Sequence, residues 1–543
     1  MESGISNDDD HWPSTAVTPR FPSLRRRIFL VYFASVELSQ ALKEALARLL
    51  GSGHVKVQEN GSWLAPFEKF QYEVREKAGA TVLHLWSQEG TLVRSVIAID
   101  ANEDDRLALQ VKRFGRNRPD ELEFVCRERE PETGHLRREQ FRARLREMLA
   151  QQFPDETISS LTSAPDLEHS LSGNYVRGIT IGRNRAAAVM AAAPGETAST
   201  YDALLTFGLI WLDRSRYRKS SQPIGALRLF FPVGCGSVTA HRPKAISASV
   251  TVELYEYDPA TRQIRRLDPQ DTGNVKSWLV PRREIEGALA QAREAIDPIR
   301  RLNAEAIAAE PIAGSQDVAL RFRGLLFARC GPGGTFFGIG SEKPLTASTW
   351  PELERLLRTL ELQRSPLASS RQHPFYRAQP ERWLESLVIA DPARIDPRID
   401  ARLLYGQVPA SSAGDRGIMD LLGITREGRL VVIELKASED VQLLMQAIDY
   451  WLRVRHHQEL SDFPRYGYFP GLDISSEPPL LFLVAPSLQF HPAGDVVARY
   501  LLPDIEIWRV GLNENWRRGL RVVLRQTLPG SSIKKRKQPW PEP

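Results

Sequence analysis

The sequence predicts an α/β domain with a mixed sheet at its C-terminal end, preceded by one or two α+β modules. Two strand-like runs, 417–425 and 429–436, flank a short polar turn, and helical patterns lie on both sides of this hairpin. Residues 479–484 form a continuously apolar run, which is typical of a parallel strand covered on both faces. The predicted order of elements is helix, three strands, helix, strand (αβββαβ).

The composition is that of a globular protein. The chain has 543 residues, of which 42% are hydrophobic and 26% charged, so it is long enough for about three domains. Its net charge of +5 is a mild basic bias that is compatible with an anionic partner. The three cysteines are widely spaced, which argues against a disulfide framework or a zinc pattern.

The first residues are acidic and polar, unlike a signal peptide. The longest apolar runs, 28–34 and 204–212, are far shorter than a membrane span of about 20 residues. We therefore expect a cytoplasmic protein without a membrane partner. The run 204–212 fits a helix and a strand equally well.

Shifts in composition predict five segments. These are a disordered start at 1–20, an α+β module of unknown function at 21–165, a second α+β module that is a candidate for substrate or partner recognition at 166–364, the α/β domain at 373–528, and a basic disordered tail at 529–543. The charged helix expected at 136–152 falls in the first module. Its acids alternate with its bases, which indicates an exposed face.

The elements of the α/β domain can be predicted in order. Pro380 suits the first turn of a helix that ends near Ile389. A strand follows at 403–408 and is stopped by Pro409. After the hairpin, Ser438 is a good N-cap for a helix that runs to about Arg455.

The hairpin register follows from its turn. Arg426, Glu427 and Gly428 form a three-residue loop with glycine in the last place, which suits a turn that ends in a left-handed residue. If Thr425 pairs with Arg429, counting back along one strand and forward along the other places residue 420 opposite residue 434. Directly opposed side chains share a face, with Cβ atoms about 5 Å apart.

This register gathers charged groups in an apolar setting. Asp420 lies opposite Glu434, and Lys436 points to the same face two residues further on. Opposed like charges destabilise a sheet, and a buried carboxylate without a partner is costly. A divalent cation such as Mg²⁺ would resolve both problems. The alternative is a structural ion pair between Lys436 and Glu434, with Asp420 solvated.

Short motifs along the domain carry a family resemblance. They are LES at 384–386, GQV at 406–408, MDLLGI at 419–424, GRLVVIELK at 428–436 and QAIDY at 446–450. Together with the element order, they resemble the PD-(D/E)XK, or restriction-endonuclease-like, nuclease superfamily, and in particular the catalytic domain of NucS-type DNA-repair nucleases. The likeness covers residues 375–490. Residues 21–365 do not resemble the usual DNA-binding partner domain of that family.

The resemblance implies a metal site. Asp420 and Glu434 would hold Mg²⁺ or Mn²⁺ together with the backbone carbonyl of Leu435. Lys436 would orient or deprotonate the attacking water. Glu385 would act through an outer-shell water or a second metal, and Gln446 would steady the lysine or the substrate.

The implied activity is metal-dependent hydrolysis of DNA phosphodiester bonds, in DNA repair or defence. RNA cleavage and a non-catalytic module that binds nucleic acid or protein remain alternatives, and a homodimer is left open. The candidates for nucleic-acid binding are Arg416, Tyr450, Arg453, Lys534, Lys535, Arg536 and Lys537.

Overall fold

The structure is a computed structural model in which most of the chain can be described. The described residues are 38–50, 54–59, 62–64, 70–77, 80–86, 91–103, 106–112, 120–127, 131–166, 170–217, 222–237, 239–269, 279–312, 315–409 and 418–528. Arg416 and the four basic residues of the tail (534–537) lie outside these ranges. No helix within them is long and apolar enough to cross a membrane.

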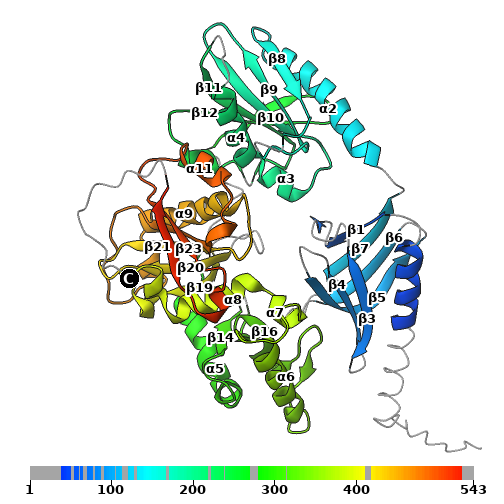
Figure 1. Cartoon of the computed structure of the whole chain (residues 1–543), viewed down its shortest axis with the longest axis vertical. Coiled ribbons are helices and arrows are strands. Elements are labelled where there is room, and N and C mark those ends of the chain that lie inside the picture. Colours follow the sequence, from blue (N-terminus) through cyan, green and yellow to red (C-terminus); the bar gives the residue numbers. More distant parts are fainter. Residues whose placement is uncertain are drawn as a thin grey trace, which may run out of the picture.

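Four sheets organise the described part of the chain (Figure 1). The first has the strand order β2-β1-β7-β6-β5-β4-β3 and the second β13-β12-β11-β10-β9-β8. The third is β14-β15-β16-β17-β18 and the fourth β19-β20-β21-β22-β23-β24. The fourth contains parallel and antiparallel pairs, so the predicted mixed sheet of the C-terminal region is confirmed.

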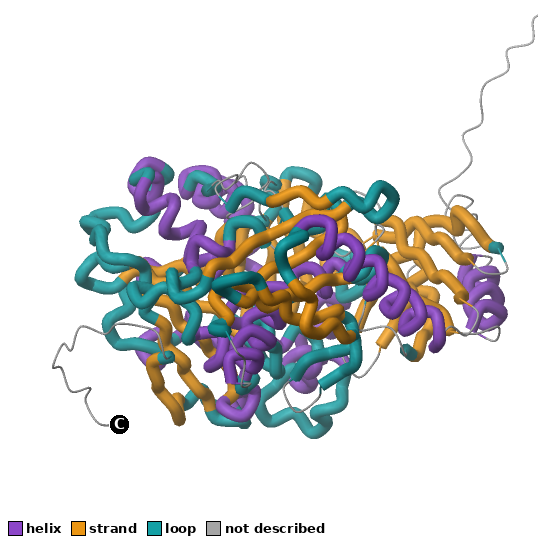
Figure 2. Tube along the Cα trace, turned by 90° about the horizontal axis from the view of Figure 1, so that it is seen from above, coloured by secondary structure: helices purple, strands orange, loops and turns teal. Residues whose placement is uncertain are grey.

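The first unit is an antiparallel sheet covered by the helix at 38–50. Leu42, Leu46 and Leu49 of that helix pack into the core of the sheet. Figure 2 shows this unit at one end of the molecule. Its strands are β1 (His54–Glu59), β2 (Ser62–Trp63), β3 (Gln71–Lys77), β4 (Ala80–Trp86), β5 (Thr91–Asn102), β6 (Arg106–Lys112) and β7 (Asp120–Arg127).

The second unit begins with α2 (Pro131–Gln152). Phe141 and Leu145 of α2 pack with Val189 and Tyr257 of the second sheet. The sequence had suggested that this helix belongs to the first module, but it packs on the second sheet. The run near residue 204 is helical. The other elements are β8 (Thr157–Thr162), β9 (Tyr175–Ile181), β10 (Ala186–Ala192), α3 (Ala198–Asp202), α4 (Leu204–Tyr217), β11 (Ile224–Pro232), η3 (Arg242–Ala245), β12 (Thr251–Tyr257) and β13 (Ile264–Arg266).

A third, smaller unit lies between the second unit and the C-terminal unit in the sequence. Helices α5 and α6 pack on its five-stranded sheet around one apolar core. The predicted second module therefore contains strands of two separate sheets. The elements are α5 (Arg282–Arg301), β14 (Ile307–Pro311), β15 (Val318–Phe322), β16 (Leu325–Gly331), β17 (Gly334–Phe337), β18 (Lys343–Pro344) and α6 (Trp350–Gln363).

The C-terminal unit contains the candidate site. Its helix α9 begins at Leu443 rather than after Ser438, because the intervening residues form a loop in which the Asp440 carboxylate accepts the N–H of Gln442. The elements are α7 (Pro374–Arg377), α8 (Pro380–Ala390), η4 (Pro392–Arg394), η5 (Ala401–Leu403), β19 (Tyr405–Pro409), β20 (Ile418–Ile424), β21 (Leu430–Leu435), α9 (Leu443–Glu459), α10 (Asp462–Arg465), β22 (Leu480–Pro486), η7 (Ser487–Gln489), α11 (Ala493–Ala498), β23 (Ile507–Leu512), η8 (Trp516–Arg518) and β24 (Val522–Thr527).

The start of α8 is held by the third unit. Gly324, in the turn between β15 and β16, has φ +81° and lies against the backbone of Arg382 and Trp383. The fully buried Arg364 donates hydrogen bonds to the carbonyls of Arg323 and Ala378. These contacts fix the position of the helix that carries Glu385.

Gly324→Ala should lower the urea midpoint of unfolding more than Gly333→Ala. A Cβ at residue 324 would overlap the carbonyl oxygen of Arg382 and requires a positive φ, and alanine at such a position costs more than about 1 kcal/mol. Gly333, in the next hairpin, has open space around its Cα. Equal midpoints for the two variants would contradict this packing.

Candidate active site

The hairpin of β20 and β21 has the predicted register. Leu421 pairs with Ile433, and the N–H of Thr425 donates to the carbonyl of Arg429 over 2.8 Å. Gly428 takes a left-handed conformation, with φ +85°. Residues 420 and 434 are therefore the next opposed positions beyond the last ladder pair.

The two strands part at these positions. The Asp420 Oδ2 accepts the backbone N–H of Leu435 over 2.9 Å, which replaces a ladder hydrogen bond. On the other side of β21, the N–H of Lys436 donates to the carbonyl of Val484. Because backbone groups alternate sides along a strand, the N–H and C=O of Leu435 both point toward β20. The carbonyl predicted as a metal ligand is thus on the side of Asp420.

Glu434 is a buried carboxylate. The residue is 4% exposed, and its Oε2 has no hydrogen-bond partner among the described residues. Burial raises the pKa of Glu434 well above its usual range, and the charge of Asp420 raises it further. Burial also raises the pKa of Asp420. The pair therefore favours a bound proton or a cation.

Lys436 supplies positive charge beside the two acids. Its Nζ lies 3.4 Å from the Asp440 Oδ2, and its side chain is 21% exposed. Burial acts to lower the pKa of Lys436, but the carboxylates of Glu434, Asp440 and Asp420 outweigh it, and the pKa is raised. Lys436 is therefore an ammonium ion at neutral pH.

Glu385 approaches from α8. It is 2% exposed and forms an ion pair with Arg382, which also pairs with Glu310 of β14. Burial raises the pKa of Glu385 to about 8; Arg382 opposes this shift, whereas Glu310 and Asp420 add to it. A Cβ at residue 406 would lie 2.9 Å from the Glu385 Oε1, so the glycine of the GQV motif makes room for this carboxylate.

Helix α9 carries Tyr450 into the electrostatic field of the acid pair. Burial raises the pKa of Tyr450, and the charges of Glu434 and Asp420 raise it further. Arg453 is 8% exposed, and its guanidinium is 5.6 Å from the Tyr450 ring centroid. Gln446 is half-buried one turn before Tyr450, on the same side of the helix. The roles predicted for these three residues stay predictions.

Three charged residues of the site were not predicted from the sequence. Arg382 precedes Glu385 by three residues, and Asp440 follows Lys436 by four. The Glu381 Oε1 accepts the N–H of Ala437 over 3.4 Å. The spacing within α8 could have indicated the Arg382 pair, whereas the other two contacts depend on the loop after β21.

The donor set fits Mg²⁺ or Mn²⁺. Mg²⁺ is usually held by one or two carboxylates, with waters completing the shell. Asp420, Glu434 and the Leu435 carbonyl could supply the protein part, and the unpartnered Glu434 Oε2 is a suitable donor. No group of three or more His, Cys, Asp or Glu side chains in the described ranges is arranged to hold a metal. The ligands would therefore include water or substrate oxygens.

Comparison of the whole sequence with protein-family models and with curated proteins gave no match. The candidate site is therefore argued from its own geometry.

In metal-free protein, Glu434→Gln should raise the melting temperature at pH 8 and change it little at pH 5. The raised pKa of Glu434 means that the folded state binds a proton that the unfolded state releases above about pH 4.3. Stability is therefore lost as the pH rises from that value toward the folded-state pKa. Glutamine removes this loss.

The measurement is a series of thermal melts in EDTA between pH 5 and pH 8. Glu427→Gln is the matched control, because it removes the same charge from the exposed turn of the same hairpin. A Glu434→Gln protein that melts below the wild type at pH 8 would contradict the unpartnered state of this carboxylate.

Proposed function

We propose that the C-terminal unit is a metal-dependent nuclease that hydrolyses DNA phosphodiester bonds at Asp420, Glu434 and Lys436. The observation that carries the proposal is the buried carboxylate of Glu434 beside Asp420, where two strands part and the Glu434 Oε2 has no hydrogen-bond partner among the described residues. The order α8, β19, β20, β21, α9, β22 supports it, because it is the order expected for the PD-(D/E)XK superfamily.

The reaction is an in-line hydrolysis. A water oxygen bonds to phosphorus and loses a proton to solvent, while the bond from phosphorus to the leaving oxygen breaks and the leaving oxygen takes a proton from solvent. A bound Mg²⁺ would neutralise the phosphate and lower the pKa of a coordinated water. Asp420 and Glu434 would hold this ion.

Lys436 would position the nucleophile and the phosphate. The carboxylates around it keep its ammonium protonated in the metal-free protein, and an ammonium donates hydrogen bonds to a water or a phosphate oxygen. This state is the one that the orienting role of Lys436 requires. Asp440 would hold the amine in place through its ion pair.

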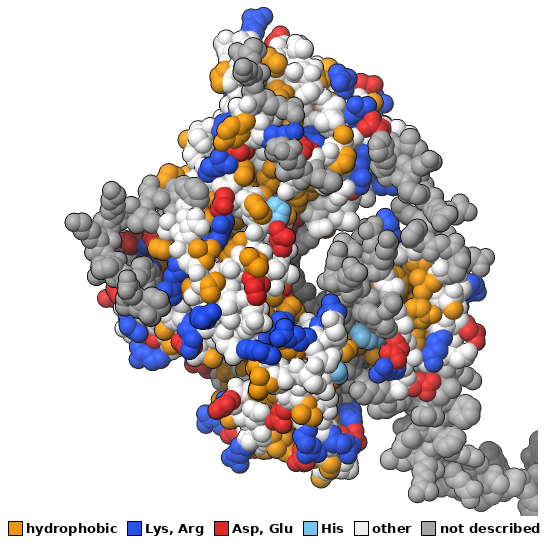
Figure 3. All heavy atoms as spheres, viewed as in Figure 1, with side chains coloured by type: hydrophobic (Ala, Val, Ile, Leu, Met, Phe, Trp, Pro, Cys, Tyr) orange, Lys and Arg blue, Asp and Glu red, His pale blue; other side chains and the backbone are white. Residues whose placement is uncertain are grey.

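A basic surface near α8 supports an anionic substrate. Figure 3 shows Lys and Arg side chains gathered over α7 and α8. Arg371, just before α7, and Arg377, at its end, are exposed. Such residues would bind the DNA backbone by an electrostatic contact that weakens with salt.

A non-catalytic nucleic-acid-binding module is the second candidate. One observation favours it: within the described ranges, no group of three His, Cys, Asp or Glu side chains is arranged to hold a metal ion. In that case the acids of the hairpin would remain protonated or paired with Lys436. Metal binding separates the two candidates.

Asp420→Asn, Glu434→Gln and Lys436→Met should each reduce DNA cleavage by at least about 100-fold. Each removes a metal ligand or the group that positions the water. The assay is cleavage of single-stranded, duplex, branched and mismatched DNA, and of RNA, with Mg²⁺ or Mn²⁺.

Asp473→Asn, which changes an exposed acid in the loop before β22, is the control and should retain full activity. Full cleavage by any of the three site variants would refute the assignment of that residue. Cleavage of RNA but not of DNA would change the substrate class and leave the site intact.

Isothermal titration should detect Mg²⁺ or Mn²⁺ binding by the wild-type protein. Asp420→Asn and Glu434→Gln should weaken it strongly, since each removes one of the two carboxylates that hold the ion. Glu427→Gln should bind the ion as the wild type does. If the wild type binds neither ion, or the site variants bind it unchanged, the non-catalytic candidate is favoured.

A further inference from the structure

Two of the four sheets have the same topology. In the second sheet, β8, β9 and β10 are antiparallel neighbours, β11 and β12 continue the sheet in parallel with β10, and β13 closes it antiparallel. In the fourth sheet, β19 to β24 repeat this pattern in the same order. A helix precedes each sheet, and another crosses over after its third strand, α4 in one and α9 in the other.

The two hairpins can be aligned by their closing hydrogen bonds. The N–H of Gly182 donates to the carbonyl of Arg185 over 2.9 Å, as Thr425 donates to Arg429. Asp420 lies five residues before Thr425, and Arg177 lies five residues before Gly182. On the other strand, Glu434 lies five residues after Arg429, and Met190 lies five residues after Arg185.

The parallel strands give the same alignment independently. Leu435 pairs with Val484, two residues before Pro486 at the end of β22. Ala191 pairs with Phe230, two residues before Pro232 at the end of β11. Ala191 therefore matches Leu435, and the residue after it, 192, matches Lys436.

The second unit has no acid pair at the matching positions. Met190 and Ala192 are fully buried among apolar side chains on the α4 side of the sheet. Arg177 replaces the aspartate, and its guanidinium lies 5.6 Å from the ring of Trp211 on α4. These three residues can neither hold a divalent cation nor activate water.

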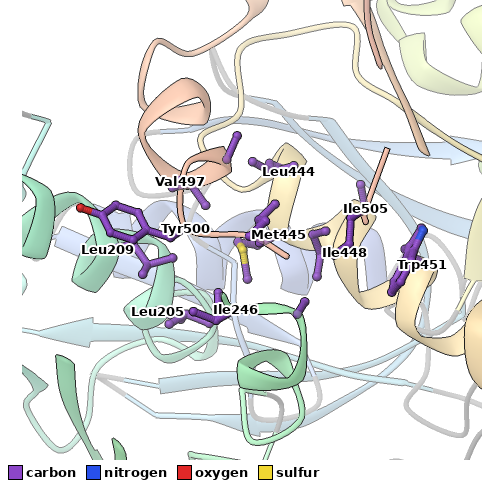
Figure 4. Close-up of a cluster of buried hydrophobic side chains, with 14 of the residues drawn as sticks. Leu205, Leu209, Ile246, Leu444, Met445, Ile448, Trp451, Val497, Tyr500 and Ile505 are labelled. Carbon is purple, nitrogen blue, oxygen red and sulfur yellow. The ribbon is translucent and has the colours of Figure 1, made fainter. Parts of the chain in front are cut away.

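The two units pack against each other in a reciprocal way. Leu205 and Leu209 of α4 and Ile246 share one core with Met445 of α9 and Val497 of α11 (Figure 4). The crossover helix of each unit contacts the segment that joins the last two parallel strands of the other, since α4 meets α11 and α9 meets η3.

The polar contacts of this interface are reciprocal too. Arg242 of η3 donates to both oxygens of Asp449 on α9. In the other direction, Arg499, directly after α11, donates to Asp213 on α4 over 3.1 Å.

Between these ion pairs the two segments form an antiparallel bridge. Ile246 faces Leu501 across it. The N–H of Ser247 donates to the carbonyl of Tyr500, and the N–H of Leu502 to that of Ala245, both over 2.8 Å. Contacts that repeat with the partners exchanged are the mark of a two-fold interface.

We propose that residues 131–267 are a degenerate second copy of the C-terminal unit, paired with it by a pseudo-two-fold axis, and that the chain therefore nicks one strand of duplex DNA in each binding event. The proposal rests on the proposed function. The strands of a duplex are antiparallel, so a symmetric pair of active units can cut both strands from one position. Here one unit of the pair carries the acids, and its partner carries Arg177, Met190 and Ala192.

The test is cleavage of supercoiled plasmid by the full-length protein, with its mass followed by light scattering under the same conditions. The expected result is a monomer that converts the plasmid to open circles, with linear DNA formed only later from accumulated nicks. Linear DNA as the first product would overturn the inference and leave the proposed function in place. No cleavage of any DNA would overturn the proposed function and this inference with it.

A pair of matched variants tests the alignment. Met190→Leu conserves the volume of its buried site and should leave the nicking rate unchanged, whereas Glu434→Gln at the matching position should abolish nicking. Thermal melts verify that both variants are folded. Loss of nicking by a folded Met190→Leu protein as severe as that of Glu434→Gln would overturn the assignment of the second unit as non-cleaving.

Discussion

The structure of the candidate site depends on the burial of the Glu434 carboxylate opposite Asp420. Two acids at opposed positions are unfavourable in an apolar sheet. The two strands part at these positions, and the Asp420 carboxylate accepts a hydrogen bond from the Leu435 N–H. The Oε2 of Glu434 has no hydrogen-bond partner among the described residues. Lys436 offsets only part of the negative charge of Asp420 and Glu434, because its ammonium also pairs with Asp440. The negative charge that is left uncompensated would favour the binding of a cation.

The pairing of two similar units explains how α9 is held. The buried Arg242 from the second unit anchors Asp449 on α9, the residue next to Tyr450. The apolar core is continuous across the two units, so neither face is left to water. A chain that already contains its own partner has no need of a homodimer to bury this surface.

The sequence predicted the part of the site that local rules determine. The loop of three residues and the alternation of side chains were enough to place Asp420 opposite Glu434. The start of α9 was predicted too early, since the Asp440 carboxylate bonds within a loop instead of in a first turn. Arg242 and Asp449 are 207 residues apart, and no local pattern joins them. The likeness of the second unit to the C-terminal unit was missed because its hairpin carries Arg177, Met190 and Ala192, so only the topology is shared.

The most direct measurement is anomalous diffraction from crystals of the full-length protein soaked with Mn²⁺. The buried acid pair predicts an anomalous peak between the Asp420 and Glu434 carboxylates, within bonding distance of the Leu435 carbonyl, and none at the matching positions of the second unit. A map with no peak at Asp420 and Glu434, although Mn²⁺ is bound elsewhere on the protein, would contradict the assignment of this hairpin as a metal site.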